Sequence, residues 1–420
     1  MSQDKAPATP VVSQAWMQAP ATLAVMSALG QAGGPDSARF VGGCVRNNLL
    51  KRPVDDIDIA TILTPDQVIQ ALTDADIRWA PTGVEHGTVT AICQGRPFEI
   101  TTLRRDVSTD GRRAVVAFTQ DWAEDARRRD FRLNALYMDA EGRIYDPLGH
   151  GVEDAKAGRI VFVGDPLSRI REDYLRILRF FRFQAWYGRG DPDPAAVAAC
   201  KALKGMLSGR SAERTSKELF KLLAADDPRP AVALMQGAGV LAAILPPTGL
   251  ERFDALVGIE RDKLYENDPE LRLAALLSDN PDEVARLAER LRLSNAQRDR
   301  LLAIAAREPR IVAWLSPREA RRAIYRLGMR AFHDRVKLAW AASMQPKLAG
   351  QWRKLLALGE SWTPPEFPLA GEDAIAAGLS QGPLIGRALK EVEDWWVDED
   401  FPEDRALALA QLDRVVLGLG

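Results

Sequence analysis

The chain has 420 residues, of which 46% are hydrophobic and 27% are charged, and its formal net charge is -2. This length and apolar content suffice for roughly two to four packed units, and the balanced charge neither demands nor excludes a polyanionic partner. The three cysteines, Cys44, Cys93 and Cys200, lie far apart in the sequence. Their spacing excludes a disulfide framework and a cysteine zinc site, and it favours a reducing cytoplasm.

The sequence contains no targeting or membrane signal. Residues 1–20 hold no basic stretch followed by an apolar run, and no uninterrupted apolar segment of about 18 residues occurs anywhere. We therefore expect a soluble, unprocessed, cytoplasmic protein without a membrane partner.

Three kinds of sequence follow one another along the chain. Residues 1–21 are rich in Ala, Pro, Gln and Ser, and they predict a flexible lead-in to a first helix at residues 22–31. Residues 39–146 contain short β-branched runs punctuated by glycine, which indicates a mixed α/β part. Beyond residue 166, apolar residues recur at intervals of three and four, which predicts helices almost to the end.

The predicted fold class is therefore α+β, with a small mixed-sheet head followed by an all-helical neck, body and tail. We place the head at residues 22–155, the neck at residues 156–235, and the body and tail at residues 236–420. Proline- and glycine-rich breaks between the helical stretches indicate several short bundles in series.

Two features of the α/β part have the spacing of a phosphate-handling site. Gly42 and Gly43 follow a strand-like run and precede a predicted helix, so backbone N–H groups can approach phosphate oxygens there. Asp56 and Asp58 open an apolar segment, and on a strand both would project from one face. Two neighbouring carboxylates repel each other, and a divalent cation offsets that repulsion. Taken alone, such features are more often a plain turn and a solvated strand face.

A third carboxylate, Glu99, alternates with Phe98 and Ile100 in another strand-like run. From a neighbouring strand it can complete the same site, because a two-metal phosphoryl-transfer site needs a further acid for its second ion. The alternative is a glutamate that simply faces solvent.

The order of these features resembles the DNA polymerase β-like nucleotidyltransferase superfamily. Within it, successive motifs over residues 42–179 are similar to those of the class II tRNA nucleotidyltransferases, the family of CCA-adding enzymes and bacterial poly(A) polymerases. These motifs are Gly42-Gly-Cys-Val-Arg46, Arg52-Pro-Val-Asp-Asp56-Ile-Asp58, Glu85-His-Gly-Thr88, Glu99-Ile-Thr-Thr-Leu-Arg104, Arg128-Arg-Asp130-Phe-Arg-Leu-Asn134 and Glu172-Asp-Tyr-Leu-Arg176-Ile-Leu-Arg179.

The resemblance implies a catalytic site at the start of the chain. Gly43 and Arg46 would contact the incoming nucleotide. Asp56 and Asp58 would be the catalytic carboxylates that hold two Mg²⁺ ions, with Glu99 as the third acid.

Further along, the resemblance implies a nucleotide-binding role for the Arg-Arg-Asp motif. Arg129 and Asp130 would read the ribose 2′-hydroxyl, because the carboxylate can accept its proton while the guanidinium donates. Asn134, Arg179 and Arg182 belong to the same predicted nucleotide-binding set.

Asp173 and Arg176 are the predicted base-reading pair. On one helix they would be neighbours three positions apart, with a carboxylate acceptor beside a guanidinium fork. The resemblance implies that they mimic the Watson–Crick edge of a base and so select CTP or ATP without a template. Residues 169–189 contain six arginines and two acids, an excess of positive charge suited to triphosphate and RNA backbone.

Other segments modify this prediction. Residues 105–120 correspond to a loop that is flexible in the family, and its full length favours complete CCA addition. Ser211 is predicted as the N-cap of a helix that resembles the family's neck helix and braces the base-reading segment. Asn47 and Arg132 stand where the family usually has Asp and Thr, and we expect Asn47 to brace its turn without loss of activity.

We therefore predict a template-independent enzyme that adds or repairs the 3′-terminal CCA of tRNA from CTP and ATP and releases diphosphate, with Mg²⁺ as cofactor. The tRNA 3′ end is the expected partner, and no stable protein partner is implied. A poly(A) polymerase shares every head motif and stays an alternative, as does an enzyme that adds only A. The acidic segment at residues 391–404 favours tRNA over generic RNA. Retention of all the motif acids disfavours a non-catalytic RNA-binding protein on a decayed scaffold.

Three remaining features receive structural interpretations. His333 and Asp334 form an HD dipeptide, but without further histidine and aspartate partners they cannot assemble a phosphohydrolase metal site. Cys44 is expected to be a small buried residue, and the pair Trp395 and Trp396 is expected in a core or an interface.

Overall fold

The computed structural model describes residues 13–110, 113–207, 209, 211–247 and 249–419. The chain divides into two compact units, Met1–Leu245 and Pro246–Gly420. The predicted head and neck both fall within the first unit, together with residues 236–245, which we had assigned to the body.

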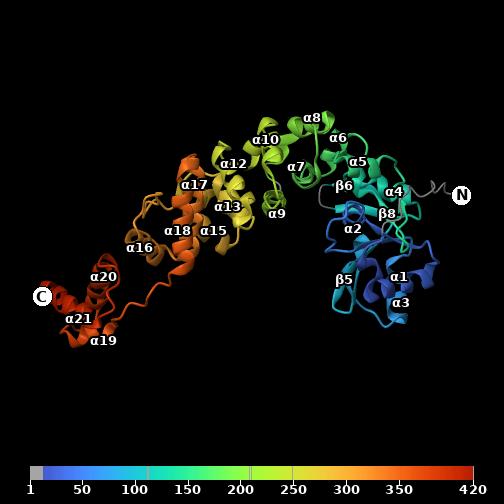
Figure 1. Cartoon of the computed structure of the whole chain (residues 1–420). Coiled ribbons are helices and arrows are strands. Elements are labelled where there is room, and N and C mark those ends of the chain that lie inside the picture. The colour runs from blue at the N-terminus through green and yellow to red at the C-terminus, as the bar shows by residue number, and fades with distance from the viewer. Residues whose placement is uncertain (1–12, 111–112, 208, 210, 248, 420) are drawn as a thin grey trace. The chain divides into compact units, whose positions relative to one another are not determined.

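A seven-stranded mixed sheet forms the base of the head, with the strand order β3-β4-β5-β2-β1-β8-β9. Figure 1 labels β5 and β8 of this sheet. Neighbouring strands are antiparallel except β2 and β5, which run parallel. The strands are β1 (Ala38–Val41), β2 (Asp58–Thr61), β3 (Arg78–Gly83), β4 (Thr88–Cys93), β5 (Arg96–Thr102), β8 (Tyr137–Met138) and β9 (Ile144–Tyr145). The predicted mixed-sheet head followed by helices is confirmed.

A separate antiparallel pair, β6 (Arg104–Asp110) and β7 (Arg113–Phe118), occupies most of the segment predicted as a loop at residues 105–120. Residues 111–112 lie outside the described part. The loop prediction is wrong for the two arms, because backbone hydrogen bonds pair them over their length. At the base of this pair, Arg104 Nη1 donates to the carbonyl of His86, so the turn before β4 is attached to it.

Helices surround the sheet and continue beyond it in the first unit. They are α1 (Pro20–Gly33), α2 (Gly43–Leu49), α3 (Pro65–Asp74), α4 (Trp122–Arg127), α5 (Gly151–Ala157), α6 (Pro166–Glu172), α7 (Arg176–Tyr187), α8 (Pro194–Leu203), α9 (Ala212–Leu223), α10 (Arg229–Gly237) and α11 (Leu241–Ile244). Short 3-10 turns are η1 (Ala15–Gln18), η2 (Val84–His86), η3 (Arg132–Asn134) and η4 (Lys204–Leu207). The helix predicted at residues 22–31 lies within α1, and Ser211 is the N-cap of α9 as predicted.

The lead-in predicted as flexible is ordered from η1 onward. Trp16 and Met17 are buried, and Trp16 Nε1 donates to Asn48 Oδ1 at 3.1 Å. The prediction of a flexible lead-in is wrong for this part. Burial of the large Trp16 side chain stabilises the packing of an otherwise polar segment. Residues 1–12 lie outside the described residues.

An aromatic cluster joins the sheet to α7. Phe131 packs against Phe162 and Phe183, with ring centroids 4.8 and 4.9 Å apart. Phe180 stacks on Phe162 at 6.0 Å, and all four side chains are buried. Burial of each such side chain contributes about 1.5–3 kcal/mol, so the cluster fixes α7 against the head.

The described residues of the second unit contain helices and no strand. The elements are α12 (Glu251–Ile259), η5 (Glu260–Leu264), α13 (Pro269–Ala275), α14 (Pro281–Arg290), α15 (Asn295–Ala305), α16 (Pro317–Leu327), α17 (Met329–Ser343), η6 (Pro346–Leu348), α18 (Ala349–Ser361), α19 (Gly371–Ala376), α20 (Pro383–Asp398) and α21 (Arg405–Leu419). Among the residues that the structure describes, no helix is long and apolar enough to cross a membrane.

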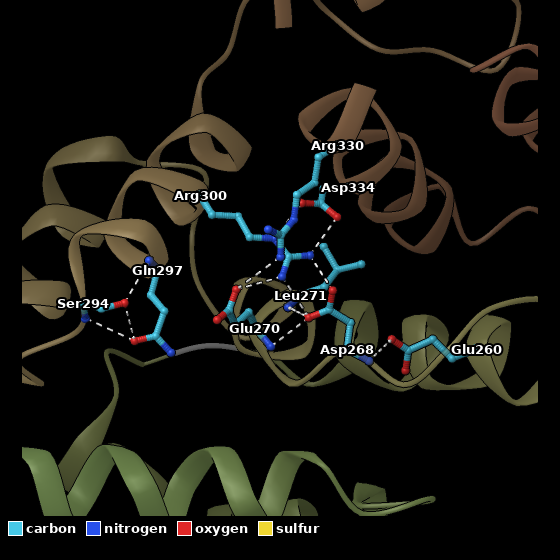
Figure 2. Close-up of polar contacts among 9 residues, drawn as sticks. All are labelled: Glu260, Asp268, Glu270, Leu271, Ser294, Gln297, Arg300, Arg330 and Asp334. Atoms are coloured by element: carbon cyan, nitrogen blue, oxygen red, sulfur yellow. Dashed lines mark hydrogen bonds and ion pairs between the residues drawn. The ribbon is translucent and has the colours of Figure 1, made fainter. Parts of the chain in front are cut away.

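An ionic cluster centred on Arg300 connects three helices of the second unit (Figure 2). The Arg300 guanidinium donates to Asp334 Oδ2 at 2.8 Å and to Glu270 Oε2 at 2.8 Å, and it also pairs with Asp268. The Arg300 side chain is only 9% exposed. Asp334 of the HD dipeptide is thus held in an ion pair, as expected for a structural role.

Aromatic residues anchor α20 to α16. The Trp396 ring packs 5.8 Å from Tyr325 and 5.0 Å from Phe401, and its side chain is buried. Arg321 on α16 pairs with Asp400 beside this core. The prediction of a core position is confirmed for Trp396 and for its partly buried neighbour Trp395.

Candidate active site

The turn between β1 and α2 depends on glycine. Gly42 has φ 72° and ψ -118°, a conformation that a side chain would strain. A Cβ there would also lie 3.6 Å from Arg129 Nη1. The helix expected after the glycines therefore begins immediately, at Gly43.

Arg46 points into the first unit and is 7% exposed. It donates to Asn134 Oδ1 at 2.5 Å and to the Tyr187 hydroxyl at 2.7 Å, and its guanidinium lies 4.1 Å from the Tyr187 ring centroid. Burial lowers the pKa of Arg46 from its usual value. These hydrogen bonds and those from Nε and Nη2 to Asn47 use four of the five N–H donors of Arg46, so a bound anion would meet its charge and its remaining Nη1 donor, in keeping with the predicted nucleotide contact.

Asn47, which replaces the aspartate usual in the family, braces this turn as predicted. Its Oδ1 accepts from Arg46 Nη2 at 3.0 Å and from the Tyr187 hydroxyl at 3.1 Å. Its Nδ2 donates to the Pro53 carbonyl at 2.9 Å. An aspartate has no donor for that last bond, so the amide ties α2 to the segment that leads to Asp56.

The three predicted catalytic acids lie at the centre of the sheet. Asp58 begins β2 and is the register partner of Glu99 on β5. Asp56 lies two residues earlier and is exposed, whereas Ile57 between them is buried. The predicted alternation is confirmed, although the strand starts at Asp58 and Asp56 precedes it.

The acids are electrostatically coupled. Burial raises the pKa of Asp58 to about 6, and the negative charges of Glu99 and Asp56 add to the effect against the attraction of Arg129. In the described part of the chain, no group donates a hydrogen bond to either the Asp56 or the Asp58 carboxylate. Among the residues described, no three His, Cys, Asp or Glu side chains lie close enough together to hold a metal ion. The repulsion between the carboxylates nevertheless gives this group of acids an affinity for a cation.

Asp130 lies at the centre of a polar network between the head and the neck. It accepts from Arg179 Nε at 2.9 Å and from Asn134 Nδ2 at 3.0 Å, and it is 8% exposed. Although burial raises its pKa, Arg179, Asn134 and the backbone of Phe131 lower that pKa to about 2. As the side chains lie, Asp130 is fully engaged, so a ribose hydroxyl would have to replace one of its present donors.

The network continues from Asp130 to α9. Arg179 and Arg182, one turn apart on α7, both approach Glu218, with Nη1 atoms 3.7 and 3.2 Å from its carboxylate oxygens. Arg179 and Arg182 of the predicted nucleotide-binding set therefore share one acid, which comes from another helix. Glu218 lies 36 residues after Arg182, so no local sequence pattern indicates this pairing.

Arg129 is held by a second buried acid, Asp125. Asp125 Oδ2 accepts from Arg129 Nη2 at 3.0 Å and from the Tyr137 hydroxyl at 2.7 Å, while Arg128 Nε donates to Oδ1 at 2.8 Å. Burial raises the pKa of Asp125, but the two guanidinium groups outweigh it and bring the pKa to about 2. The sequence does not reveal this role of Asp125, because an acid three or four residues before an arginine usually indicates an ion pair on a helix surface. Arg132, by contrast, turns to Asp154, 3.6 Å away.

The base-reading pair does not lie on one helix. Helix α6 ends at Glu172, Asp173 has an extended backbone with φ -151°, and α7 begins only at Arg176. The prediction that Asp173 and Arg176 are neighbours on one helix is therefore wrong. Asp173 Oδ1 instead accepts from the Leu175 backbone N–H at 3.1 Å, a local bond that competes with helix continuation.

Each member of that pair has another partner. Arg214 Nη2 on α9 donates to Asp173 Oδ2 at 2.7 Å. Arg176 Nη1 donates to Glu172 Oε2 at 2.5 Å and to the Arg169 carbonyl at 2.8 Å. Glu172 and Arg214 are thus site residues that sequence analysis did not single out, and Glu172 was visible in its motif.

Cys44 is buried beside the site, and its Sγ lies 3.3 Å from the Val41 carbonyl. Burial raises the pKa of its thiol to about 11, so it is no nucleophile, as predicted.

Comparison with known proteins agrees with this geometry. The family described as Poly A polymerase head domain matches residues 38–161, and the one described as Probable RNA and SrmB-binding site of polymerase A matches residues 191–249. The mitochondrial CCA tRNA nucleotidyltransferase 1 of Mus musculus is 33% identical over 393 residues, which cover 90% of this chain and 86% of that protein. The chain belongs to the CCA tRNA nucleotidyltransferase family.

Bacterial members of the family are equally similar. The CCA-adding enzyme of Streptococcus pneumoniae (strain G54) is 33% identical over 385 residues, which cover 89% of this chain and 92% of that enzyme. The solved structure of the Bacillus stearothermophilus CCA-adding enzyme in complex with CTP has a TM-score of 0.76 at 26% identity and covers 96% of this chain and 98% of its own. The similarity extends over both units, so the family assignment does not rest on the head alone.

Proposed function

We propose that the protein adds or repairs the 3′-terminal CCA of tRNA, using CTP and ATP. The observation that carries this proposal is the contact network inside the first unit. It runs from Arg46 through Asn134 and Asp130 to Arg179, and so connects the Gly-Gly turn beside the catalytic acids to the neck. The relatives described above are a CCA tRNA nucleotidyltransferase and a CCA-adding enzyme, which supports the same reaction.

The reaction is nucleotidyl transfer. The tRNA 3′-oxygen attacks the α-phosphorus of CTP or ATP, the bond from that phosphorus to the bridging oxygen breaks, and diphosphate leaves while the hydroxyl proton is lost. Asp56 and Asp58 are the proposed catalytic acids, and Glu99 is the register partner of Asp58. This exchange would occur beside them. Arg46 and Arg129 would bind and orient the phosphates and ribose.

We propose Mg²⁺ as the cofactor and Asp56 and Asp58 as its ligands. The residues fit such an ion, because two carboxylates without hydrogen-bond donors repel each other and Asp58 is partly buried. When bound, Mg²⁺ lowers the pKa of an attacking hydroxyl and stabilises the charge of departing diphosphate. The acids themselves would keep the ions next to the α-phosphate.

Base choice is assigned to Asp173 and Arg176. Asp173 accepts a hydrogen bond from Arg214, and Arg176 donates one to Glu172. These bonds hold the carboxylate acceptor and the guanidinium donors in defined orientations. A cytosine or adenine edge would share these groups. The body and tail would bind tRNA mainly through its backbone and shape. The free cysteines are consistent with the cytoplasmic location that we propose.

The deciding experiment uses the full chain, Mg²⁺ and a tRNA transcript that ends at the discriminator base. CTP, ATP or both are supplied, and the 3′ ends are sequenced. Products that stop at CCA support the proposal. A growing A tract from ATP alone would identify a poly(A) polymerase, and a single A added only to tRNA ending in CC would identify an A-adding enzyme.

A further inference from the structure

A cavity of about 350 Å³ lies within the second unit, well apart in sequence from the catalytic residues. It is lined by residues of α12 and α17 and by the segment that follows α15. Its charged lining residues are Arg252, Asp279, Arg307, Glu308, Arg310 and Arg335. Four arginines and two acids give the wall a formal excess of positive charge. The remaining lining side chains are apolar, so the charged residues are the ones that can bind a polar ligand.

One of the four arginines is already neutralised. Arg252 Nη1 donates to Asp279 Oδ1 at 2.6 Å, and its other nitrogens donate to the carbonyls of Ala274 and Ala275. Since Arg252 and Asp279 pair with each other, the excess charge belongs to the remaining arginines.

Arg335 on α17 is buried and forms no ion pair with a carboxylate in the described part of the chain, although the charges of Glu308 and Asp279 act on it. It donates to the carbonyls of Glu308 and Pro309 at 3.0 and 2.6 Å, and it is 7% exposed. Burial lowers the pKa of this guanidinium from its usual value. Carbonyl dipoles orient the guanidinium but do not cancel its charge, so an anion in the cavity would be stabilised.

Arg307 and Arg310 lie on the segment after α15, and both are exposed. Within the described residues, neither side chain makes an ion pair or a hydrogen bond. The only acid between Arg307 and Arg310 in the sequence is Glu308, so this segment carries an excess of positive charge. Together with Arg335 they surround the cavity with guanidinium groups of the kind that bind phosphate oxygens through paired donors.

We propose that this cavity binds a phosphate group of the RNA backbone. The inference rests on the proposed function, since it assigns a specific contact to the body of an enzyme that acts on tRNA. A volume of about 350 Å³ is at the low end of ligand sites and is large enough for a phosphate group. The apolar walls around Ile304, Ile311 and Leu338 offer nothing to base edges. Such a contact fixes the position of an RNA without reading its sequence.

The test compares binding of a tRNA transcript without CCA to the full chain and to the Arg307→Ala/Arg310→Ala variant, over a range of salt concentrations. Both arginines are exposed, so the variant is expected to fold. The control, Arg286→Ala/Lys347→Ala, removes two exposed and unpaired cations of the same unit outside the cavity. We expect the cavity variant to bind roughly ten-fold more weakly, and the slope of log affinity against log salt to fall by about 0.9 for one lost phosphate. The control should change neither the slope nor the affinity by a comparable amount.

A second arm tests a free anion as the occupant. Calorimetry with sodium diphosphate and with inorganic phosphate is performed on the wild type and on the cavity variant. Anion binding that is lost in the variant while tRNA affinity and salt slope stay unchanged would overturn the RNA assignment in favour of a free phosphate. Equal losses in the cavity variant and the control would also overturn it, because general charge would then explain the effect.

Failure of the proposed function is distinguishable from failure of this inference. If the wild type adds no CCA but the cavity variant alone loses affinity and slope, the site stands and the activity does not. If the wild type adds CCA and the cavity variant binds tRNA with unchanged affinity and slope, the cavity assignment is wrong.

Discussion

Arg214, near the start of α9, donates a hydrogen bond of 2.7 Å to Oδ2 of Asp173, which lies 41 residues earlier in the chain. Asp173 is the acceptor half of the proposed base-reading pair, and its backbone has left the helix on which it was expected. The orientation of its carboxylate therefore depends on a side chain from a different helix. The other oxygen of Asp173 is held by the Leu175 backbone, so Arg214 completes the set of contacts that limits its rotation.

We predict that Arg214→Met reduces the discrimination between CTP and ATP. A charge-assisted hydrogen bond contributes about 1.5–3 kcal/mol, so loss of this bond would change the ratio of kcat/KM values for the two nucleotides by roughly ten-fold. The rate with the correct nucleotide should fall less than the ratio. Lys217→Met on the same helix, whose side chain is exposed, is the matched control. An unchanged ratio in Arg214→Met would rule out this positioning role.

The proposed catalytic acids should show opposite effects on activity and on stability. Asp58→Asn is predicted to abolish nucleotide incorporation, while raising the free energy of unfolding by about 1–2 kcal/mol when a chelator is present. The folded pKa of Asp58, about 6, lies above the ordinary value of 3.8, so its charge destabilises the folded state, and this cost is fully present above about pH 6. Removal of the charge relieves the cost of its burial and the repulsion from Glu99. Urea unfolding at pH 8 in EDTA measures the effect.

The neighbouring Asp55→Asn provides the control for that experiment, because Asp55 is exposed and lies one residue before Asp56. It should retain incorporation and show no change in unfolding free energy beyond about 0.5 kcal/mol. Substantial turnover by Asp58→Asn would refute the metal assignment.

Asp125 is predicted to stabilise the head in a pH-dependent manner. Its folded pKa of about 2 lies below the ordinary value of 3.8, so its contribution is fully present above about pH 4 and is lost as the pH falls towards 2. Asp125→Asn should therefore cost at least about 2 kcal/mol of unfolding free energy at pH 7. The difference from wild type should shrink in acid, whereas a gap that stays constant with pH would show that the charge is not responsible.

The ionic cluster of Figure 2 gives a prediction for the second unit. Arg300→Met would leave the carboxylates of Asp268, Glu270 and Asp334 without their shared cation, at a cost of about 3–5 kcal/mol. Arg298→Met, which breaks an exposed pair with Asp299, should cost less than about 1 kcal/mol. Chemical denaturation of both variants tests the contrast, and a similar small loss in each would show that the cluster contributes little.

The combination of Arg300→Met with Asp334→Asn separates repulsion from lost contacts. If uncompensated negative charge causes most of the damage, the double variant should be more stable than Arg300→Met alone. A purely additive loss would point instead to packing of the arginine side chain.

The sequence by itself determined the order of a mixed-sheet head followed by helices, and it predicted which acids lie together. Alternation of Asp56, Ile57 and Asp58 predicts two carboxylates beside a buried residue, because side chains of extended backbone alternate in direction. The same kind of local rule predicted Ser211 as a helix N-cap. Local rules reach only a few residues along the chain.

The tertiary structure alone decided which side chains meet. The register of β2 against β5 brings Glu99 opposite Asp58. The packing of α9 on α7 brings Glu218 to Arg179, and Arg214 of α9 meets Asp173 in the segment between α6 and α7. These pairs are separated by about forty residues, and no periodicity in the sequence relates them. Burial lowers the local dielectric, so the partner that packing supplies, more than the residue type, determines the pKa and orientation of each buried acid.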